Sequence, residues 1–413
     1  MWWRRSAMAE TAFPRFEDIL ALCKESDSEF AVRVVDELLK WAGELEASDL
    51  HLNPLEDGLE VRVRVDGVLH RAGTLPAFAQ RKVITRMKVL ADLLTYRSDI
   101  PQEGRIRRPV GGPEVRISTL PSLYGERVVA RFFPEETRFK LLDDLGFPER
   151  ITELLKKLLR ETSGAIFMTG PAGSGKTTTM YACLRELVQE EIPRSIITIE
   201  DPIEVAIPGV IQSQVEPRVG LDLSAALRYL MRQDPEVVAV GEIRDRATAE
   251  AAVEASLTGH LILSTFHAGG AAESVGRLLD MGIEPYLIRS GVLAVLSQRL
   301  LRQVCTCSEW TDDPQAALGL PVERVRVARG CPECRNTGYT NRFSIAEILL
   351  LQDERIARAV LECVDVVTLE KLALEQGMVS LWDSAVQAVK EGRTTPVEVR
   401  RVLGWSDYWR ILE

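Results

Sequence analysis

The sequence predicts an α/β protein whose larger domain contains a parallel β-sheet and is preceded by a smaller α+β domain. Two patterns carry this prediction. In the second half of the 413-residue chain, short β-branched or apolar runs alternate with stretches of helical periodicity, which is typical of a parallel sheet covered on both faces. In the first part, polar and apolar residues alternate along short runs, as they do in strands with one buried face.

The composition is that of a globular protein and gives the chain room for two or three domains. No uninterrupted apolar run approaches the roughly 18–20 residues that span a bilayer. The first residues, Met1 to Arg5, are not followed by the apolar core of a signal peptide, so we expect a cytoplasmic protein. Its seven cysteines then indicate reduced thiols or a metal site. The net charge of −10 weighs against a generic nucleic-acid coat, which needs a basic face.

The first part of the chain contains the predicted α+β domain, residues 31–133. Residues 1–30 carry little pattern and are predicted to form a short arm. Asp66-Gly67 supplies a hairpin turn between two alternating runs. The predicted elements are a helix over 32–47, strands at 49–52, 61–65 and 68–69, a helix over 78–94, and strands over 104–110, 114–119 and 126–133.

A charged, turn-rich stretch, residues 134–145, is predicted to link this domain to the α/β domain, residues 146–413. Beyond Gln298 the pattern changes to a cysteine-bearing insertion, residues 305–334, followed by mostly helical segments. The predicted strands of the parallel sheet include 165–168, 196–200, 237–241 and 261–265, and a helix is predicted from 177 to about 190.

The segment 169–179 joins the first of these strands to the helix and has the spacing G-x-x-x-x-G-K-T. Its glycines let successive N–H groups point at one anion, and the helix N-terminus adds partial positive charge. Lys176 would reach the β- and γ-phosphates and Thr177 would ligate Mg²⁺. The alternative is a chance glycine turn, but such a turn would not need a strand before it and a helix after it, whereas a phosphate-binding loop does. The residues predicted to bind a nucleoside triphosphate are Gly170, Pro171, Ala172, Gly173, Ser174, Gly175, Lys176, Thr177 and Thr178.

Two acidic clusters, residues 200–204 and 241–245, follow predicted strands, where ligands bind in α/β folds. Glu242 lies where an apolar strand ends in an acid, which is the usual position of a carboxylate near a metal. Either acid could instead cap a helix, but two such clusters in one phosphate-binding domain favour the catalytic interpretation. His267 follows another apolar strand and could sense the γ-phosphate, whereas His260 could equally be a satisfied core or loop residue.

Taken together, these motifs resemble the type II secretion and type IV pilus assembly ATPases, also described as the secretion ATPase superfamily. The resemblance extends from about residue 31 to the C-terminus, and it implies a RecA-like P-loop ATPase domain preceded by a PAS-like α+β domain. The segments that carry it are 169–179, 198–204, 227–245 and 258–267 in the larger domain, and 47–52, 61–69, 101–105 and 115–131 in the smaller one.

The resemblance also implies roles for individual residues. Glu204 would orient or deprotonate the attacking water, and Glu242 would hold Mg²⁺ through water. His267 would couple the nucleotide state to the neighbouring segment. Arg116 and Arg131, from the smaller domain, would stabilise charge that develops on the phosphates. Further family arginines near the nucleotide or a subunit boundary match Arg228, Arg232 and Arg244.

Such enzymes act as hexameric rings, and ATP-driven rocking between their two domains moves an inner-membrane platform protein. The resemblance therefore implies a homohexamer that binds ATP and Mg²⁺, is cytoplasmic and peripheral at the inner membrane, and does not use nucleic acid as a partner. Only about thirty residues precede the first shared motif. We therefore expect the chain to lack the extra N-terminal domain through which many relatives dock.

The cysteines depart from the family pattern. The secretion and pilus-extension branches carry paired C-x-x-C motifs that hold a structural zinc. Here Cys331 and Cys334 fit this spacing, but Cys305 and Cys307 are one residue closer together. Four thiolates around Zn²⁺ or four free thiols are both compatible with the sequence. The cysteine insertion favours the secretion or extension branch over a pilus retraction motor.

Two other classes of protein remain as alternatives. A nucleic-acid-stimulated motor, such as a helicase, could share the phosphate-binding core. The acidic balance and the lack of an aromatic and basic stripe weigh against it. A nucleotide-binding scaffold without turnover is the second alternative, and the presence of both Glu204 and Glu242 argues against it.

Overall fold

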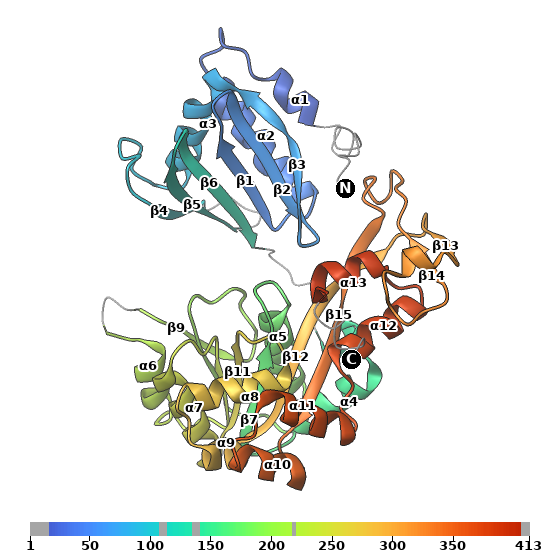
Figure 1. The fold of residues 1–413 in the computed structure, drawn as a ribbon. Helices are drawn as coiled ribbons and strands as arrows, with labels where there is room; N and C mark the ends of the chain where they lie inside the picture. The colour runs from blue at the N-terminus through green and yellow to red at the C-terminus, as the bar shows by residue number, and fades with distance from the viewer. Residues whose placement is uncertain (1–15, 107–113, 134–140, 217–219, 406–413) are drawn as a thin grey trace. The chain divides into compact units, whose positions relative to one another are not determined.

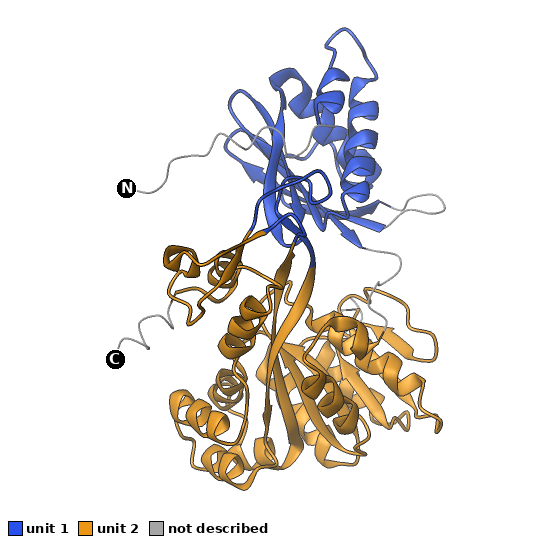
Figure 2. Ribbon diagram, turned by 90° about the vertical axis from the view of Figure 1, so that its right-hand side faces the viewer, with its two compact units in different colours: residues 1–136, 305–308, 328–341 blue, residues 137–304, 309–327, 342–413 orange. Residues whose placement is uncertain are grey.

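The computed structural model describes residues 16–106, 114–133, 141–216 and 220–405. These residues form two compact units (Figure 2). The first unit comprises residues 1–136 together with residues 305–308 and 328–341, which contain the four cysteines of the insertion, and the second unit comprises the remainder of the chain.

The first unit contains a six-stranded sheet of order β3-β2-β1-β6-β5-β4, in which all the neighbouring pairs are antiparallel. The helices α2 and α3 lie together on one face of this sheet (Figure 1). Its strands are β1 (Asp49–Pro54), β2 (Gly58–Val65), β3 (Val68–Pro76), β4 (Gln102–Ile106), β5 (Glu114–Ser122) and β6 (Gly125–Phe133), and its helices are α1 (Phe16–Ala21), α2 (Phe30–Glu44) and α3 (Ala77–Leu90).

The alternation of the strands buries one side of this sheet against the helices. Leu50 and Leu52 of β1 and Val61 and Val63 of β2 are fully buried in a single core. Because side chains alternate between the faces of a strand, the polar residues between these positions lie on the opposite face. The first unit therefore has one apolar and one polar sheet face.

The expectation of a patternless arm over residues 1–30 is wrong for its second half, because residues 16–21 form α1. Phe16 and Ile19 of this helix are buried in the core of the first unit, and the Phe16 ring lies 6.1 Å from the Trp41 ring of α2. A helix of six residues is too short to show a clear period, so packing against α2 provides its stability. The predicted arm residues 1–15 lie outside the described residues, as do residues 107–110 of the predicted strand 104–110 and residues 134–140 of the predicted linker.

The second unit contains a seven-stranded sheet of order β15-β12-β7-β11-β10-β8-β9, and the pairs from β12 to β9 are all parallel (Figure 1). A small two-stranded sheet, β13-β14, accompanies it. The strands are β7 (Gly164–Thr169), β8 (Ile196–Glu200), β9 (Ile211–Gln214), β10 (Val237–Val240), β11 (Leu261–Phe266), β12 (Val292–Val304), β13 (Glu309–Thr311), β14 (Val325–Val327) and β15 (Tyr339–Leu350). The helices are α4 (Glu149–Leu158), α5 (Lys176–Val188), α6 (Leu223–Leu230), α7 (Arg246–Leu257), α8 (Ala271–Asp280), α9 (Pro285–Gly291), α10 (Glu354–Leu361), α11 (Val366–Glu375), α12 (Leu381–Lys390) and α13 (Pro396–Leu403), with 3₁₀ turns at Leu142–Leu145 and Pro314–Ala317.

Both faces of the parallel sheet are covered, as the sequence predicts. Neighbouring residues of β7 enter different cores: Phe167 packs with α6 to α11, and Met168 packs with α4 and α5. Every residue of β7, β8, β10 and β11 is buried. Strands covered on both faces read as continuous apolar runs, and this is the pattern that predicted them.

The end of the chain contains more strand than expected. After Gln298, mostly helical segments are predicted beyond the cysteine insertion, yet β12 continues to Val304 and β15 adds a further strand of twelve residues. In the large sheet β12 lies between β15 and β7, whereas β15 forms one edge, and most apolar residues of both strands are buried. The helices α10 to α13 then follow, as predicted.

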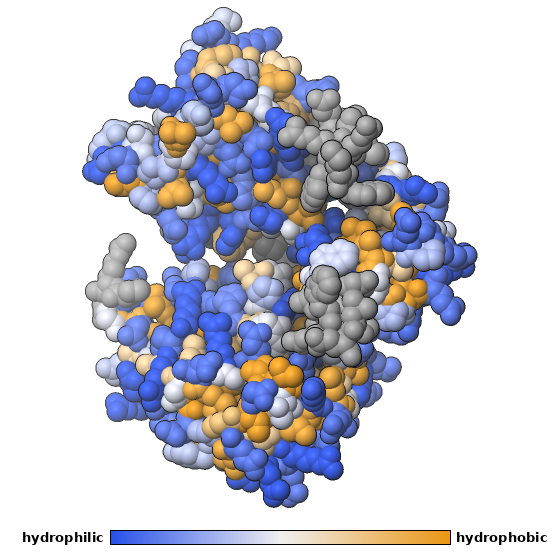
Figure 3. All heavy atoms as spheres, in the orientation of Figure 1, coloured by the Kyte–Doolittle hydropathy of each residue, from blue (hydrophilic) through white to orange (hydrophobic). Residues whose placement is uncertain are grey.

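The surface of the second unit carries apolar side chains over its C-terminal helices (Figure 3). The large exposed apolar residues of these helices include Leu361 of α10, Val367 and Leu374 of α11, and Val397 of α13. Among the described helices, none combines the length and the apolar character that crossing a bilayer requires.

Candidate active site

The phosphate-binding loop predicted from the sequence lies between β7 and α5, at the carboxyl end of the parallel sheet. Gly175 is the N-cap residue of α5 and has a φ of 91°, a conformation that favours glycine. A Cβ on Gly173 would meet no atom within 4 Å, so the loop leaves open space at this point. This open, glycine-lined helix N-terminus fits the phosphates of a nucleotide.

Lys176 folds back onto its own loop. Its Nζ donates hydrogen bonds to the carbonyls of Gly170 and Pro171, both at 2.9 Å, and lies 3.3 Å from His267 Nδ1. Burial lowers the pKa of Lys176, and the charge of Glu242 partly opposes this shift. The ammonium is thus held in a partly desolvated position, where it interacts more strongly with an anion than it would in water.

Glu242 and His267 follow the neighbouring strands β10 and β11 and contact each other. His267 Nε2 lies 2.8 Å from Glu242 Oε1, and His267 Nδ1 is 3.1 Å from the Gly170 carbonyl. The other carboxylate oxygen of Glu242 accepts a hydrogen bond from Arg244 at 3.0 Å. His267 therefore links the carboxylate after β10 to the phosphate-binding loop.

Glu204 lies in the loop that follows β8, and its backbone N–H donates to the Tyr181 hydroxyl at 3.2 Å. Glu204 is exposed, whereas Glu200, at the end of β8, is buried. Arg244 Nη1 also reaches Asp201 at 3.6 Å. The two acidic clusters predicted from the sequence therefore lie on adjacent strands and are joined by an arginine.

Two residues that were not among the sequence-based candidates also bind the loops at this edge of the sheet. Gln298 of β12 donates from Nε2 to the Ser174 carbonyl at 2.8 Å, and Arg299 donates to the Gly269 carbonyl at 2.5 Å. Gln298 is fully buried. Gln298 and Arg299 follow the apolar run that begins β12, much as Glu242 follows the apolar run of β10. The same sequence pattern could therefore have pointed to them.

Other candidate residues of the second unit lie on its surface or at a helix end. Arg228 donates to Ser224 within α6, and Arg228 and Arg232 are both exposed. His260 Nδ1 lies 3.1 Å from the Ala255 carbonyl of α7, which agrees with the loop interpretation of this histidine.

Arg116 and Arg131 lie in the first unit, on neighbouring strands, and are directly paired in the register of β5 and β6. Each forms an ion pair within its own sheet: Arg116 with Glu103 at 2.6 Å, and Arg131 with Asp49 at 3.0 Å. Their side chains remain 40% and 64% exposed. The polar face of this sheet thus presents two adjacent, accessible guanidinium groups.

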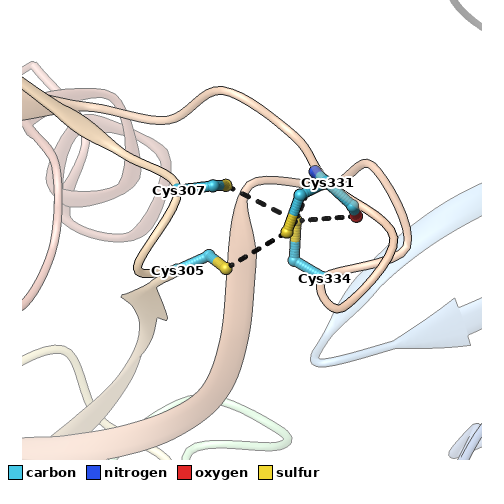
Figure 4. Close-up of side chains that lie close together, drawn as sticks. All are labelled: Cys305, Cys307, Cys331 and Cys334. Carbon is cyan, nitrogen blue, oxygen red and sulfur yellow. Dashed lines mark hydrogen bonds between the residues drawn. The ribbon is translucent and has the colours of Figure 1, made fainter.

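The four cysteines that the sequence singled out lie together in the first unit (Figure 4). Their side chains point toward one another, with S···S distances of 3.8 Å for Cys305 and Cys331, 3.9 Å for Cys307 and Cys334, and 3.7 Å for Cys331 and Cys334. Zinc bound tetrahedrally at roughly 2.3 Å places its sulfur ligands roughly 3.8 Å apart. The cluster therefore fits zinc despite the shortened C-x-C half.

The surroundings of the cluster favour a thiolate at Cys305. A hydrogen bond from the Cys307 backbone lowers the pKa of Cys305 to about 7, whereas burial raises the pKa of Cys307. Cys334 Sγ accepts hydrogen bonds from the backbone N–H groups of Cys331 and Gly338, at 3.1 and 3.2 Å. In the same loop, Arg335 donates to the Leu45 carbonyl at the end of α2 at 2.9 Å.

Comparison with known proteins places this chain among secretion and pilus proteins. The family profile described as "Type II/IV secretion system protein" matches residues 24–401. The chain is 39% identical over 400 residues to "Type II secretion system protein E" of Xanthomonas campestris pv. campestris, covering 94% of this chain and 70% of that protein. It is 38% identical over 386 residues to "Type IV pilus assembly ATPase PilB" of Thermus thermophilus, covering 91% of this chain and 43% of that protein.

Among solved structures, the fold is similar to that of the ATPase DotB of Legionella pneumophila. The TM-score is 0.67 at 22% sequence identity, with 91% of this chain and 97% of that chain covered. At this level of identity the likeness concerns the fold, and it agrees with the P-loop ATPase architecture that the sequence predicts.

Proposed function

Because the chain belongs to the type II/IV secretion system protein family, we propose that it is an ATPase motor that powers type II protein secretion or type IV pilus assembly. The relatives named as ATPases support hydrolysis of ATP to ADP and phosphate as its activity. The observation that carries the proposal is the convergence of Lys176, His267 and Glu242 at one edge of the parallel sheet. Family membership also implies Mg²⁺ as the metal that accompanies the nucleotide.

We propose that the loop between β7 and α5 binds the ATP phosphates. Its backbone N–H groups and the start of α5 supply the anion site. Lys176 then exchanges its hydrogen bonds to the Gly170 and Pro171 carbonyls for the phosphate oxygens. Thr177 would hold Mg²⁺ directly, and Glu242 would hold it through water. When bound, the Mg²⁺ ion neutralises charge on the phosphates.

In this proposal, Glu204 orients and deprotonates the water that attacks the γ-phosphate. It lies in an exposed loop, where water can reach it, and its backbone is fixed by Tyr181. His267 contacts both Glu242 and the phosphate-binding loop, so a movement of the loop would also displace Glu242. This contact supports a role for His267 in coupling the nucleotide state to the adjacent segment.

Arg116 and Arg131 are proposed to stabilise charge on the phosphates in the transition state. Arg131→Ala should lower kcat by about 10²-fold and change ATP affinity much less, because this charge develops during transfer. Steady-state kinetics and equilibrium nucleotide binding check this result. Arg71→Ala, which removes another exposed arginine of the first unit, is the control and should leave kcat unchanged. An Arg131→Ala protein with the wild-type kcat would contradict the assignment.

The cysteine cluster is proposed to hold one structural zinc through Cys305, Cys307, Cys331 and Cys334. Metal analysis of protein purified without added zinc should find about one equivalent per chain. A chelator should raise hydrogen exchange selectively in the insertion, because the metal stabilises this segment locally. The exposed Cys363 provides a control thiol that should titrate with or without metal. Four freely titrating cluster thiols and no metal would contradict this assignment.

We further propose that the chain acts in the cytoplasm as a homohexamer, peripheral at the inner membrane and docked on a platform protein. ATPase stimulation discriminates this proposal from a nucleic-acid motor. Vesicles of acidic phospholipid, or a cytoplasmic fragment of a platform protein, should accelerate hydrolysis, and DNA or RNA should not. Acceleration by nucleic acid alone would instead favour the helicase-like alternative.

A further inference from the structure

A buried carboxylate connects the phosphate-binding helix to the loop that carries Glu204. Glu200 is 2% exposed, at the end of β8. Its Oε1 accepts hydrogen bonds from Thr198 Oγ1 at 2.6 Å and from Gln212 Nε2 at 3.0 Å, and its Oε2 accepts one from the Tyr181 hydroxyl. Both oxygens are therefore satisfied by three side chains from three different elements.

The direction of the hydrogen bonds at Tyr181 is fixed by this arrangement. A tyrosine hydroxyl has one proton, and a carboxylate offers only acceptors, so Tyr181 donates its proton to Glu200. The hydroxyl oxygen is then available to accept the backbone N–H of Glu204, at 3.2 Å. Burial raises the pKa of Tyr181, and the hydrogen bond to Glu200 raises it further. The hydroxyl thus keeps the proton that it donates to Glu200.

Gln212 holds the next part of the same loop from the other side. Its Nε2 donates to the Val205 carbonyl at 3.1 Å as well as to Glu200, and its Oε1 accepts the Ile207 N–H at 2.7 Å. The backbone is therefore fixed at three positions between residues 204 and 207. All three fixing bonds come from side chains that are themselves bound to Glu200.

From this geometry we propose that Tyr181, Glu200 and Gln212 are positioning residues that hold the loop of Glu204 in register with the phosphate-binding helix. The inference rests on the role proposed above for Glu204. Tyr181 lies five residues after Lys176 on α5. The same helix therefore carries the phosphate-binding lysine and the hydroxyl that fixes the catalytic loop, and it sets the distance between the γ-phosphate and the attacking water.

A purely structural role does not account for these residues. Burying a carboxylate costs free energy, and apolar residues of similar size would pack the same space at no such cost. A hydrogen-bonded network instead fixes direction as well as distance. Transfer of a proton from water requires both, since the base must lie within roughly 3 Å of the water in a defined orientation.

Tyr181→Phe tests the proposal because it keeps the ring and removes only the hydroxyl. We expect kcat for ATP hydrolysis to fall about tenfold or more, while the KM and the affinity for ATP change by less than about threefold. Gln212→Leu should have the same pattern and serves as the second variant if Tyr181→Phe does not fold. Tyr229→Phe is the matched control, because Tyr229 is 64% exposed on α6, and it should keep the wild-type kcat.

Combination with Glu204→Gln separates positioning from a general loss of structure. If Tyr181 acts through Glu204, then Tyr181→Phe should add less than about twofold to the loss that Glu204→Gln causes alone. A full additional tenfold loss would overturn the proposal, as would equal changes in kcat and KM, or a wild-type kcat in both folded single variants. A Glu204→Gln enzyme with wild-type turnover would instead show that the proposed base is wrong, which is a distinguishable failure.

Discussion

Lys176→Ala is expected to lower ATP affinity by about 10- to 100-fold and to reduce hydrolysis below detection. In the structure the Lys176 ammonium is buried, with carbonyl partners only 2.9 Å away, so it is already placed in the loop that is proposed to receive the phosphates. Alanine removes the positive charge that would contact the β- and γ-phosphates and leaves the glycine loop in place. Isothermal titration with a non-hydrolysable ATP analogue measures the first effect and phosphate release the second.

The control for this substitution is Lys157→Ala, which removes an exposed lysine of α4. It should bind and hydrolyse ATP as the wild type does. Thermal unfolding of both variants tests whether the loop still folds. A folded Lys176→Ala protein with wild-type affinity would contradict the assignment of the nucleotide site.

Glu204→Gln is expected to retain ATP binding and to lose turnover by about 10²- to 10⁴-fold. The amide cannot accept a proton from the attacking water, but it is nearly the same size as the carboxylate. The hydrogen bond between the Glu204 backbone and Tyr181 does not involve the side chain, so the loop should keep its position. The expected consequence is a protein that binds Mg²⁺ and ATP and holds them without hydrolysis.

Glu191→Gln provides a matched control, because Glu191 is exposed and follows α5 outside the acidic clusters. It should hydrolyse ATP at the wild-type rate. Wild-type turnover in Glu204→Gln would mean that another group activates the water, and Glu242 would be the next residue to test.

Sequence patterns pointed to most residues of the candidate active site because these residues follow strands that are covered on both faces. Such strands appear as short apolar runs, and the residue after each run lies at the same edge of the sheet. The acidic cluster 200–204, Glu242 and His267 were all proposed in this way. The sequence pattern could not reveal the hydrogen-bond network at Tyr181, because a buried tyrosine on a helix has the same spacing as an ordinary core residue.

The elements that were missed depend on contacts distant in sequence. The first seven residues of β12 are all buried, so they show no alternation that distinguishes a strand from a buried helix. The six-residue helix α1 is stabilised by contacts such as that of Phe16 with Trp41 rather than by its own sequence. The cysteine cluster illustrates the same point, since Cys305 and Cys331 approach to 3.8 Å across 26 residues and no ligand spacing alone predicts that distance.

The proposed motor function is tested by phosphate release from the purified wild-type chain and from Glu204→Gln, both with bound ATP confirmed. We expect Mg²⁺-dependent hydrolysis by the wild type that stops when EDTA removes the metal, and a Glu204→Gln protein that remains loaded with ATP. If the folded wild-type protein binds Mg²⁺ and ATP yet releases no phosphate, including in the presence of acidic phospholipid vesicles, the chain is a nucleotide-binding scaffold and the proposed motor function is contradicted.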